Sequence, residues 1–256
     1  MAPLHGIGVL VTRPEQQATP LCRLLQAQGA ETLRLPAIDI RPLPDSSARI
    51  GTLDAFDIIV LTSANAVRYG AALLEARPDS VLAAIGAATA RALREHGYDV
   101  TLEPDGGFSS EALLAHPGLE HLTAKRVLLI KGADGRPMLE RELRRRGASV
   151  IGIDVYERVP ASPSAGDLAA AQAAFTAGRL QVITATSLDI GKRLLEIVPD
   201  DLRAQFQKAL WLVPGERVAA GLRDLGLNAP MLTAASAEDH DLLAALLRWR
   251  SSESDE

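Results

Sequence analysis

Four short segments place small polar residues or glycine between an apolar run and a helix-like pattern. They are Thr62-Ser63, Gly86 to Thr89, Thr186-Ser187 and Gly215 to Arg217. The start of a helix offers unpaired backbone N–H groups and the positive end of the helix dipole, and both features favour carboxylates and phosphates. We therefore expect these four corners to bind an anionic ligand. Ser63 and Ser187 could instead serve only as helix caps.

Basic residues that follow strand-like runs could add positive charge to such a site. They are Arg13, Lys131 (followed by Gly132) and Arg217. We expect these residues to contribute to ligand binding, although Arg13 and Lys131 could also be solvated residues at turns. The chain has 27 Lys and Arg against 32 Asp and Glu, a net charge of −5. An anion would therefore be held by local amides and a few cations.

Composition excludes several function classes. Aromatic residues make up 4% of the chain, too few for a surface that stacks bases, and the net charge opposes binding to a phosphate backbone. Cys22 is the only cysteine, which excludes an internal disulfide and a thiol-rich metal site. Residues 1–8 do not resemble a secretory signal, and no apolar run approaches the ~20 residues of a membrane span. We expect a cytoplasmic protein that binds neither nucleic acid nor membranes.

The elements that must position these residues follow a regular pattern. Four segments read Leu-x-x-x-Gly, which is typical of a helix that ends at a glycine in the left-handed conformation. The glycines are Gly29, Gly97, Gly147 and Gly226, followed by strand-like runs at residues 31–35, 99–102, 149–154 and 229–232. Other apolar runs precede helices, at residues 8–12, 56–61, 81–85, 126–130, 180–184 and 209–213. This alternation predicts an α/β fold with parallel sheets that helices cover on both faces.

The order of these elements repeats along the chain. Val9 to Pro14 aligns with Val127 to Gly132, and Thr62-Ser63 aligns with Thr186-Ser187. We predict two copies of one unit, near residues 1–122 and 123–256. Two proline-containing stretches, at residues 35–44 and 155–163, fit neither copy as helix-flanked strands. Proline favours extended neighbours, so both stretches are predicted to be paired or parallel linkers at a domain boundary.

Four arginines crowd the helix that is predicted to end before Gly147. They are Arg141, Arg144, Arg145 and Arg146. Positive side chains compensate the negative end of a helix dipole. We expect them to form a solvated face with no role in ligand binding.

A series of short motifs occurs in a fixed order. They are Val11 to Pro14, Leu61 to Val67, Ala84 to Leu93, Ser110 to Leu114, Lys131 to Arg136, Arg146 to Ala148, Val155 to Arg158, Thr186-Ser187 and Pro214 to Arg217. Their order and spacing resemble the uroporphyrinogen-III synthase family over nearly the whole length. One departure concerns Thr89, because the corresponding second-copy segment, residues 213–217, lacks a threonine and leaves any hydroxyl role there in doubt.

The resemblance implies two similar lobes, each a parallel sheet flanked by helices. Residues 1–37 would join residues 160–256 through an exchanged first βαβ unit, and residues 38–159 would form the other lobe with a two-stranded linker. The cleft between the lobes would bind hydroxymethylbilane, a chain of four pyrroles with eight carboxylates. The family closes this chain with inversion of the terminal (D) ring and loss of water, through an azafulvenium and a spiro intermediate. No cofactor or metal is needed.

The resemblance also implies a catalytic role for Tyr156, which matches the tyrosine of the family's Val-Tyr motif. Its phenol could donate a hydrogen bond to the departing hydroxyl. Because a phenol is a weak acid at neutral pH, we expect assistance rather than an indispensable proton donor. The ring could also act only as a wedge that packs the linker against a lobe.

Partner and alternative functions remain open at this point. We expect a monomer, since no long exposed apolar helix face stands out, and a transient contact with the preceding deaminase is possible. A two-lobed sensor domain of the periplasmic-binding type is one alternative, although such proteins normally carry a signal peptide or a DNA-binding headpiece. An inactive relative of the synthase is another.

Overall fold

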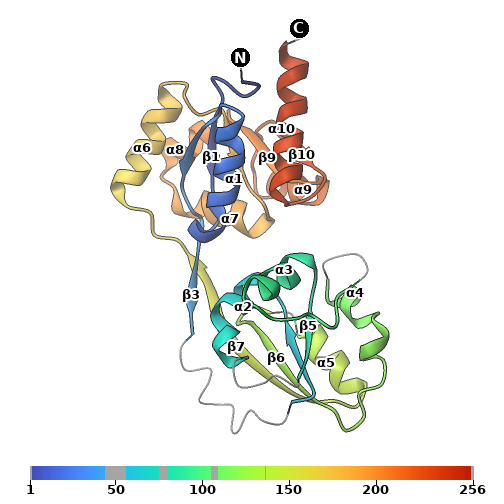
Figure 1. Ribbon diagram of the computed structural model, residues 1–256. Helices are drawn as coiled ribbons and strands as arrows, with labels where there is room; N and C mark the ends of the chain where they lie inside the picture. The colour runs from blue at the N-terminus through green and yellow to red at the C-terminus, as the bar shows by residue number, and fades with distance from the viewer. Residues whose placement is uncertain (1, 44–55, 75–79, 105–108, 136, 255–256) are drawn as a thin grey trace. The chain divides into compact units, whose positions relative to one another are not determined.

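The computed structural model describes residues 2–43, 56–74, 80–104, 109–135 and 137–254. Pro44 and Arg136, which belong to stretches singled out above, lie outside the described residues. The chain divides into two compact units, which Figure 1 shows with their elements labelled. Unit 1 contains residues 1–39 and 159–256, and unit 2 contains residues 40–158. No helix in the described part of the chain is long and apolar enough to cross a membrane.

Unit 1 is built on a parallel sheet in the order β10-β9-β8-β1-β2. Its strands are β1 (Gly8–Val11), β2 (Glu31–Arg34), β8 (Val182–Thr184), β9 (Leu210–Pro214) and β10 (Met231–Ala234). Its helices are α1 (Glu15–Ala27), α6 (Ala165–Thr176), α7 (Leu188–Ile197), α8 (Asp200–Phe206), α9 (Glu216–Asp224) and α10 (Asp239–Ser254). The aliphatic residues of β1 are fully buried, as expected for a strand with helices on both faces.

The two faces of this sheet have separate cores. Val9 and Val11 of β1 pack with α1 and α10 in one apolar cluster. Trp211 alternates with the inward residue Leu212 along β9 and so points to the opposite face. There Trp211 meets Phe206 of α8, with ring centroids 6.0 Å apart, and donates from its indole nitrogen to the Phe206 carbonyl at 2.9 Å.

Unit 2 has the order β3-β7-β6-β4-β5. Its strands are β3 (Ile38–Pro42), β4 (Ile58–Leu61), β5 (Val81–Ala84), β6 (Arg126–Gly132) and β7 (Ser149–Pro160). The helical elements are α2 (Ala64–Gly70), η2 (Ala71–Leu73), α3 (Ala87–Glu95), α4 (Ser110–Leu114), η3 (Pro117–Leu119) and α5 (Met138–Arg145). The pairs β5-β4, β4-β6 and β6-β7 are parallel, and an apolar cluster joins β4 and β6 to α4 and α5.

The predicted α/β class is confirmed, with parallel sheets flanked by helices. β1 and β2 belong to the sheet of the C-terminal strands, which is the exchange that the family resemblance implies. The repeated motifs also occupy matching places. β5-β4-β6-β7 in unit 2 corresponds in order to β9-β8-β1-β2 in unit 1.

The helix ends agree with the pattern read from the sequence. All four predicted stop glycines have positive φ, from 83° at Gly97 to 95° at Gly147, a conformation that costs glycine little. The strand predicted at residues 99–102 is not formed. Only Leu102 pairs there, in an isolated bridge with Ala83.

The two proline-containing stretches pair with each other. The Leu43 N–H donates to the Val155 carbonyl at 2.9 Å, and the Ala161 N–H donates to the Ala37 carbonyl at 3.0 Å. The residue numbers rise on one side as they fall on the other, so the pairing is antiparallel. The prediction of a separate strand at residues 149–154 was wrong in one respect. β7 runs unbroken through Tyr156 to Pro160, and no proline removes a backbone donor between Ser149 and Val159.

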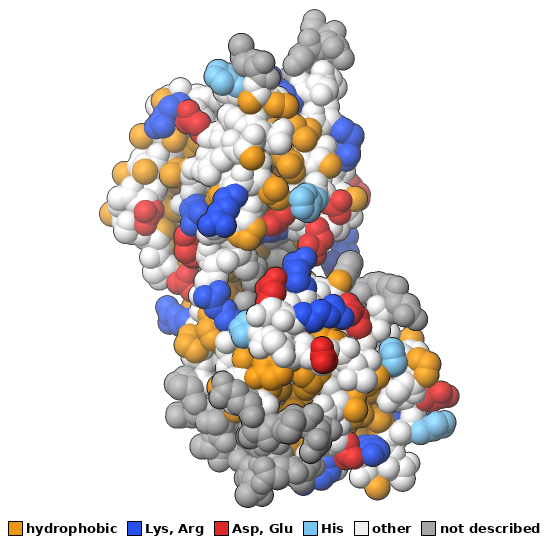
Figure 2. All heavy atoms as spheres, viewed as in Figure 1, with side chains coloured by type: hydrophobic (Ala, Val, Ile, Leu, Met, Phe, Trp, Pro, Cys, Tyr) orange, Lys and Arg blue, Asp and Glu red, His pale blue; other side chains and the backbone are white. Residues whose placement is uncertain are grey.

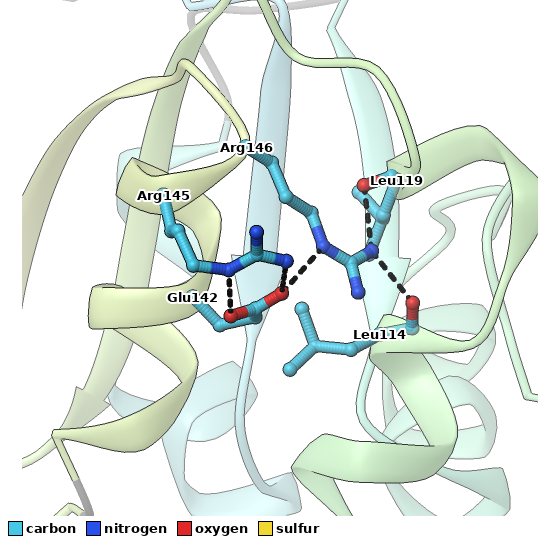
Figure 3. Close-up of polar contacts among 5 residues, drawn as sticks. All are labelled: Leu114, Leu119, Glu142, Arg145 and Arg146. Atoms are coloured by element: carbon cyan, nitrogen blue, oxygen red, sulfur yellow. Dashed lines mark hydrogen bonds and ion pairs between the residues drawn. The ribbon is translucent and has the colours of Figure 1, made fainter.

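Arginines at the end of α5 form hydrogen bonds that were not expected of a solvated face, as Figure 3 shows for Arg145 and Arg146. Glu142 accepts hydrogen bonds from Arg145 at 2.7 and 2.8 Å and from Arg146 at 3.0 Å. These bonds lower the pKa of Glu142 from 4.5 to about 2, and those from Arg145 have the largest effect. Arg146 also donates to the carbonyls of Leu114 and Leu119 at 2.7 and 2.8 Å. The prediction of a solvated face is therefore wrong for Arg146, whose side chain is 18% exposed, against 71% for Arg145.

Substitution of these two neighbours should affect stability unequally. Arg146→Ala removes the donor from the carbonyls of Leu114 and Leu119, and we expect a loss of about 2 kcal/mol in the free energy of unfolding. Arg145→Ala breaks an exposed ion pair and should cost much less, because solvent screens such pairs. Urea denaturation of both variants at pH 7 measures the difference. Equal losses would show that Arg146 has no structural role beyond its ion pair.

Candidate active site

The predicted corners collect at the carboxyl edges of the two sheets. In unit 2 the chain passes from β4 to β5 on one side and then to β6 on the other side of β4. In unit 1 the same reversal occurs between β2 and β8, on either side of β1. Ligands of open α/β sheets bind outside the carboxyl ends of the strands at such a reversal. Thr62-Ser63 and Lys131-Gly132 stand at the reversal in unit 2.

Tyr156 and Ser63 lie in direct contact at this edge. The Tyr156 hydroxyl is 3.0 Å from the Ser63 Oγ, and either atom could donate. Ser63 is the N-cap of α2, because its Oγ accepts from the Ala66 N–H at 2.9 Å. The Tyr156 ring is 4% exposed and is tilted by 37° against the Tyr69 ring, with centroids 6.1 Å apart. The structure thus joins the predicted catalytic residue to a predicted binding residue.

Gly132 provides the space for the Tyr156 ring. The register of β6 and β7 shifts after Lys131, so that Gly132 lies opposite Tyr156. A Cβ atom on Gly132 would lie 2.6 Å from Cζ and 2.9 Å from the hydroxyl oxygen of Tyr156. Both distances are too short for any side chain. Gly132 therefore fixes where the phenol lies, a function that the sequence did not indicate.

The remaining predicted residues of unit 2 surround the same edge. The Thr62 N–H and hydroxyl both face the Ile130 carbonyl, at 3.1 and 3.4 Å, and extend the pairing of β4 with β6. Gly86 is buried and precedes α3, where its carbonyl accepts from the Thr89 N–H at 3.0 Å. The side chain of Thr89 is buried, at 3% exposure.

Lys131 is compensated by a neighbour on β7. Its ammonium forms an ion pair with Asp154, and its side chain is 15% exposed. The alternative of a solvated lysine at a turn is therefore wrong. Any ligand that Lys131 binds would share the ammonium with this carboxylate.

Unit 1 repeats part of this arrangement. Ser187 is the N-cap of α7, and its Oγ accepts from the Ile190 N–H at 3.2 Å, while Thr186 beside it is half-buried. Gly215 is the N-cap of α9 and has a φ of 76°, which favours glycine. Arg217 is exposed, and within the described residues it forms no ion pair. On the face that Figure 2 shows, the described Lys and Arg side chains are interspersed with Asp and Glu.

Arg13 has a structural role that the sequence did not reveal. It is buried at 8% exposure, and its guanidinium binds the carboxylate of Asp239 and the carbonyl of Ala237. It thereby connects the end of β1 to the start of α10. The alternative of a solvated residue is wrong for Arg13, and its cation is already paired. The sequence places Asp239 and Asp241 in the first turn of α10, where acidic residues are common. It does not indicate that Asp239 pairs with Arg13.

Other reactive groups lie away from these edges. Cys22 is buried in α1 as a free thiol. Within the described ranges, no three His, Cys, Asp or Glu side chains are grouped to bind a metal ion.

Comparison with known proteins assigns the chain to a family. The family model described as uroporphyrinogen-III synthase HemD matches residues 20–244. The chain belongs to the uroporphyrinogen-III synthase family. The resemblance of its motifs is thereby confirmed, and the family's activity is that of a cyclising lyase of porphyrin biosynthesis.

Full-length relatives support this assignment. The uroporphyrinogen-III synthase of Salmonella typhimurium is 31% identical over 250 residues, and that of Escherichia coli is 28% identical over 256 residues. Each alignment covers 94% of this chain and 100% of the relative.

Solved structures show the same fold. A mutant uroporphyrinogen III synthase from the extremely thermophilic bacterium Thermus thermophilus matches with a TM-score of 0.59 at 23% identity, covering 98% of this chain and 100% of its own. The enzyme from Helicobacter pylori matches with a TM-score of 0.59 at 17% identity, covering 95% of this chain and 99% of its own.

Substitution of Gly132 tests whether it makes room for the phenol. Gly132→Ala should lower the free energy of unfolding by about 2 kcal/mol, the cost of overpacking, because its methyl would overlap the Tyr156 ring. The same substitution should cost much less in a Tyr156→Ala background. Gly152→Ala on β7 is the control, since its Cβ would meet the ends of the Glu140 and Lys131 side chains at 3.3 Å or more. Denaturant titration measures all variants, and an equal cost in both backgrounds would contradict this role.

Proposed function

We propose that this chain converts hydroxymethylbilane to uroporphyrinogen III, with inversion of the terminal (D) ring and loss of water. The family assignment supports the reaction. The observation that carries the proposal is the contact of Tyr156 with Ser63 at the point where the strand order of unit 2 reverses. The phenol of Tyr156 is held there by its contact with Ser63. It lies at the edge of the sheet where α2 and α3 begin, and helix starts favour carboxylates.

Binding of the substrate would rely on backbone donors. The helices α2, α3, α7 and α9 each begin at a carboxyl edge, after Ser63, Gly86, Ser187 and Gly215. Their unpaired N–H groups favour carboxylates. Arg217 adds an exposed positive charge, whereas Arg13 and Lys131 contribute cations that Asp239 and Asp154 already balance. A chain with a net charge of −5 can bind a polyanion in this way.

Catalysis would be mainly positional. The Tyr156 phenol donates a hydrogen bond to the terminal hydroxyl, which takes up a proton, leaves as water and generates the azafulvenium cation. The bound carboxylates hold the chain so that the last ring reacts through the spiro intermediate, which fragments and recloses with that ring inverted. The final ring closure releases one proton from the last ring, so the net loss is one water. Restriction of a flexible chain to one reactive geometry can supply a large part of a barrier reduction. None of these steps changes an oxidation state.

A second part of the proposal concerns the cell compartment, the oligomeric state and the partner of the enzyme. We propose a cytoplasmic monomer that receives its substrate from the preceding deaminase by transient contact. The single cysteine, buried and unpaired, suits a reducing compartment. We also propose that residues 1–37 with 160–256 and residues 38–159 act as the two lobes of the enzyme.

Product analysis tests the function directly. Enzymatically generated hydroxymethylbilane, incubated with the protein and then oxidised, should give predominantly the type III porphyrin on chromatographic separation of isomers. Type I product alone would leave only the inactive-relative or binding-module alternatives.

Tyr156→Phe should lower kcat about tenfold, the loss of one well-placed hydrogen bond, while circular dichroism stays unchanged. Unchanged turnover in Tyr156→Phe would exclude the phenol as a donor.

A further inference from the structure

The Ser63 hydroxyl has a donor on one side and a phenol on the other. Its oxygen accepts from the Ala66 N–H at 2.9 Å and lies 3.0 Å from the Tyr156 hydroxyl. A serine hydroxyl has one proton and two lone pairs. Because the Ala66 N–H occupies a lone pair, the proton of Ser63 is free to be donated to the Tyr156 oxygen.

The phenol has little freedom to make a different contact. Its ring is 4% exposed and lies against Gly132, where not even a methyl group would fit. The Tyr69 ring lies beside it, with centroids 6.1 Å apart. Packing thus sets the plane of the ring, and the remaining variable is the rotation of its O–H bond.

We propose that Ser63 is a positioning residue that sets this rotation. Ser63 donates to the Tyr156 oxygen, so the Tyr156 proton points away from Ser63 and toward the departing hydroxyl of the substrate. The resulting series of donors runs from the Ala66 N–H through Ser63 to Tyr156, and such series strengthen each hydrogen bond in them. This inference rests on the proposed function of Tyr156.

Helix capping is a separate role of Ser63 and can be tested separately. Ser109 caps α4 in the same way, with its Oγ accepting from the Ala112 N–H at 3.2 Å. Ser109 is in the same unit but follows no strand of the carboxyl edge. Ser109→Ala therefore removes an equivalent cap and leaves the proposed site intact.

A double-mutant cycle tests the inference. Ser63→Ala should lower kcat for type III formation about fivefold in the wild-type protein and less than about twofold in a Tyr156→Phe background, the loss expected for one hydrogen bond that acts through another. KM should change less than kcat, since the phenol acts on the leaving group. Ser63→Thr, which keeps a hydroxyl, should retain most of the turnover. Ser109→Ala should lower the melting temperature to a similar degree as Ser63→Ala and leave kcat unchanged.

Each outcome separates the positioning role from the proposed function. Should Ser63→Ala fold poorly, Ser63→Gly removes the hydroxyl at little cost to the cap and takes its place in the cycle. An equal fold-loss of kcat in both backgrounds would overturn the positioning role, while the function stands if wild-type protein makes type III product. A Tyr156→Phe variant with full kcat would overturn both the phenol's role and this inference.

Discussion

Parallel pairing of strands is the constraint on which the site depends. In each unit the paired strands of the carboxyl edge run in one direction, so the following helices begin at one edge of the sheet. Backbone donors at Ser63, Gly86, Ser187 and Gly215 are placed by this arrangement and not by side-chain chemistry. A site of this kind needs few charged residues. The parallel arrangement of both sheets also explains why both halves of the chain have a helix start after corresponding strands.

Local charge near these edges is balanced inside the protein. Arg13 is paired with Asp239 and Lys131 with Asp154. Burial of an unpaired charge is costly, so each cation keeps a carboxylate partner. The basic residues therefore contribute to the structure of the edges as well as to their potential. The phenol of Tyr156, for which we propose acid assistance, is positioned by contact with a glycine and not by a charge.

The elements could be predicted well from the sequence because their signals are local. Short apolar runs identified the strands, and glycine at Gly29, Gly97, Gly147 and Gly226 identified the ends of helices. The contact of Tyr156 with Ser63 could not be predicted, because the two residues lie 93 positions apart. The register shift of β6 against β7, which places Gly132 opposite Tyr156, has no local signal in the sequence either. Nor could the bonds of Arg146 to Leu114 and Leu119, since these depend on how distant turns pack.

Backbone amide NMR during titration with uroporphyrin III, a stable eightfold carboxylate, tests most directly whether helix starts bind the ligand. We expect shifts at the helix starts that follow Ser63, Gly86, Ser187 and Gly215, at the carboxyl edges. Amides at Thr123 and Gly147, which precede β6 and β7 at the opposite edge of unit 2, should stay unchanged. Shifts confined to that opposite edge would contradict binding by the helix starts.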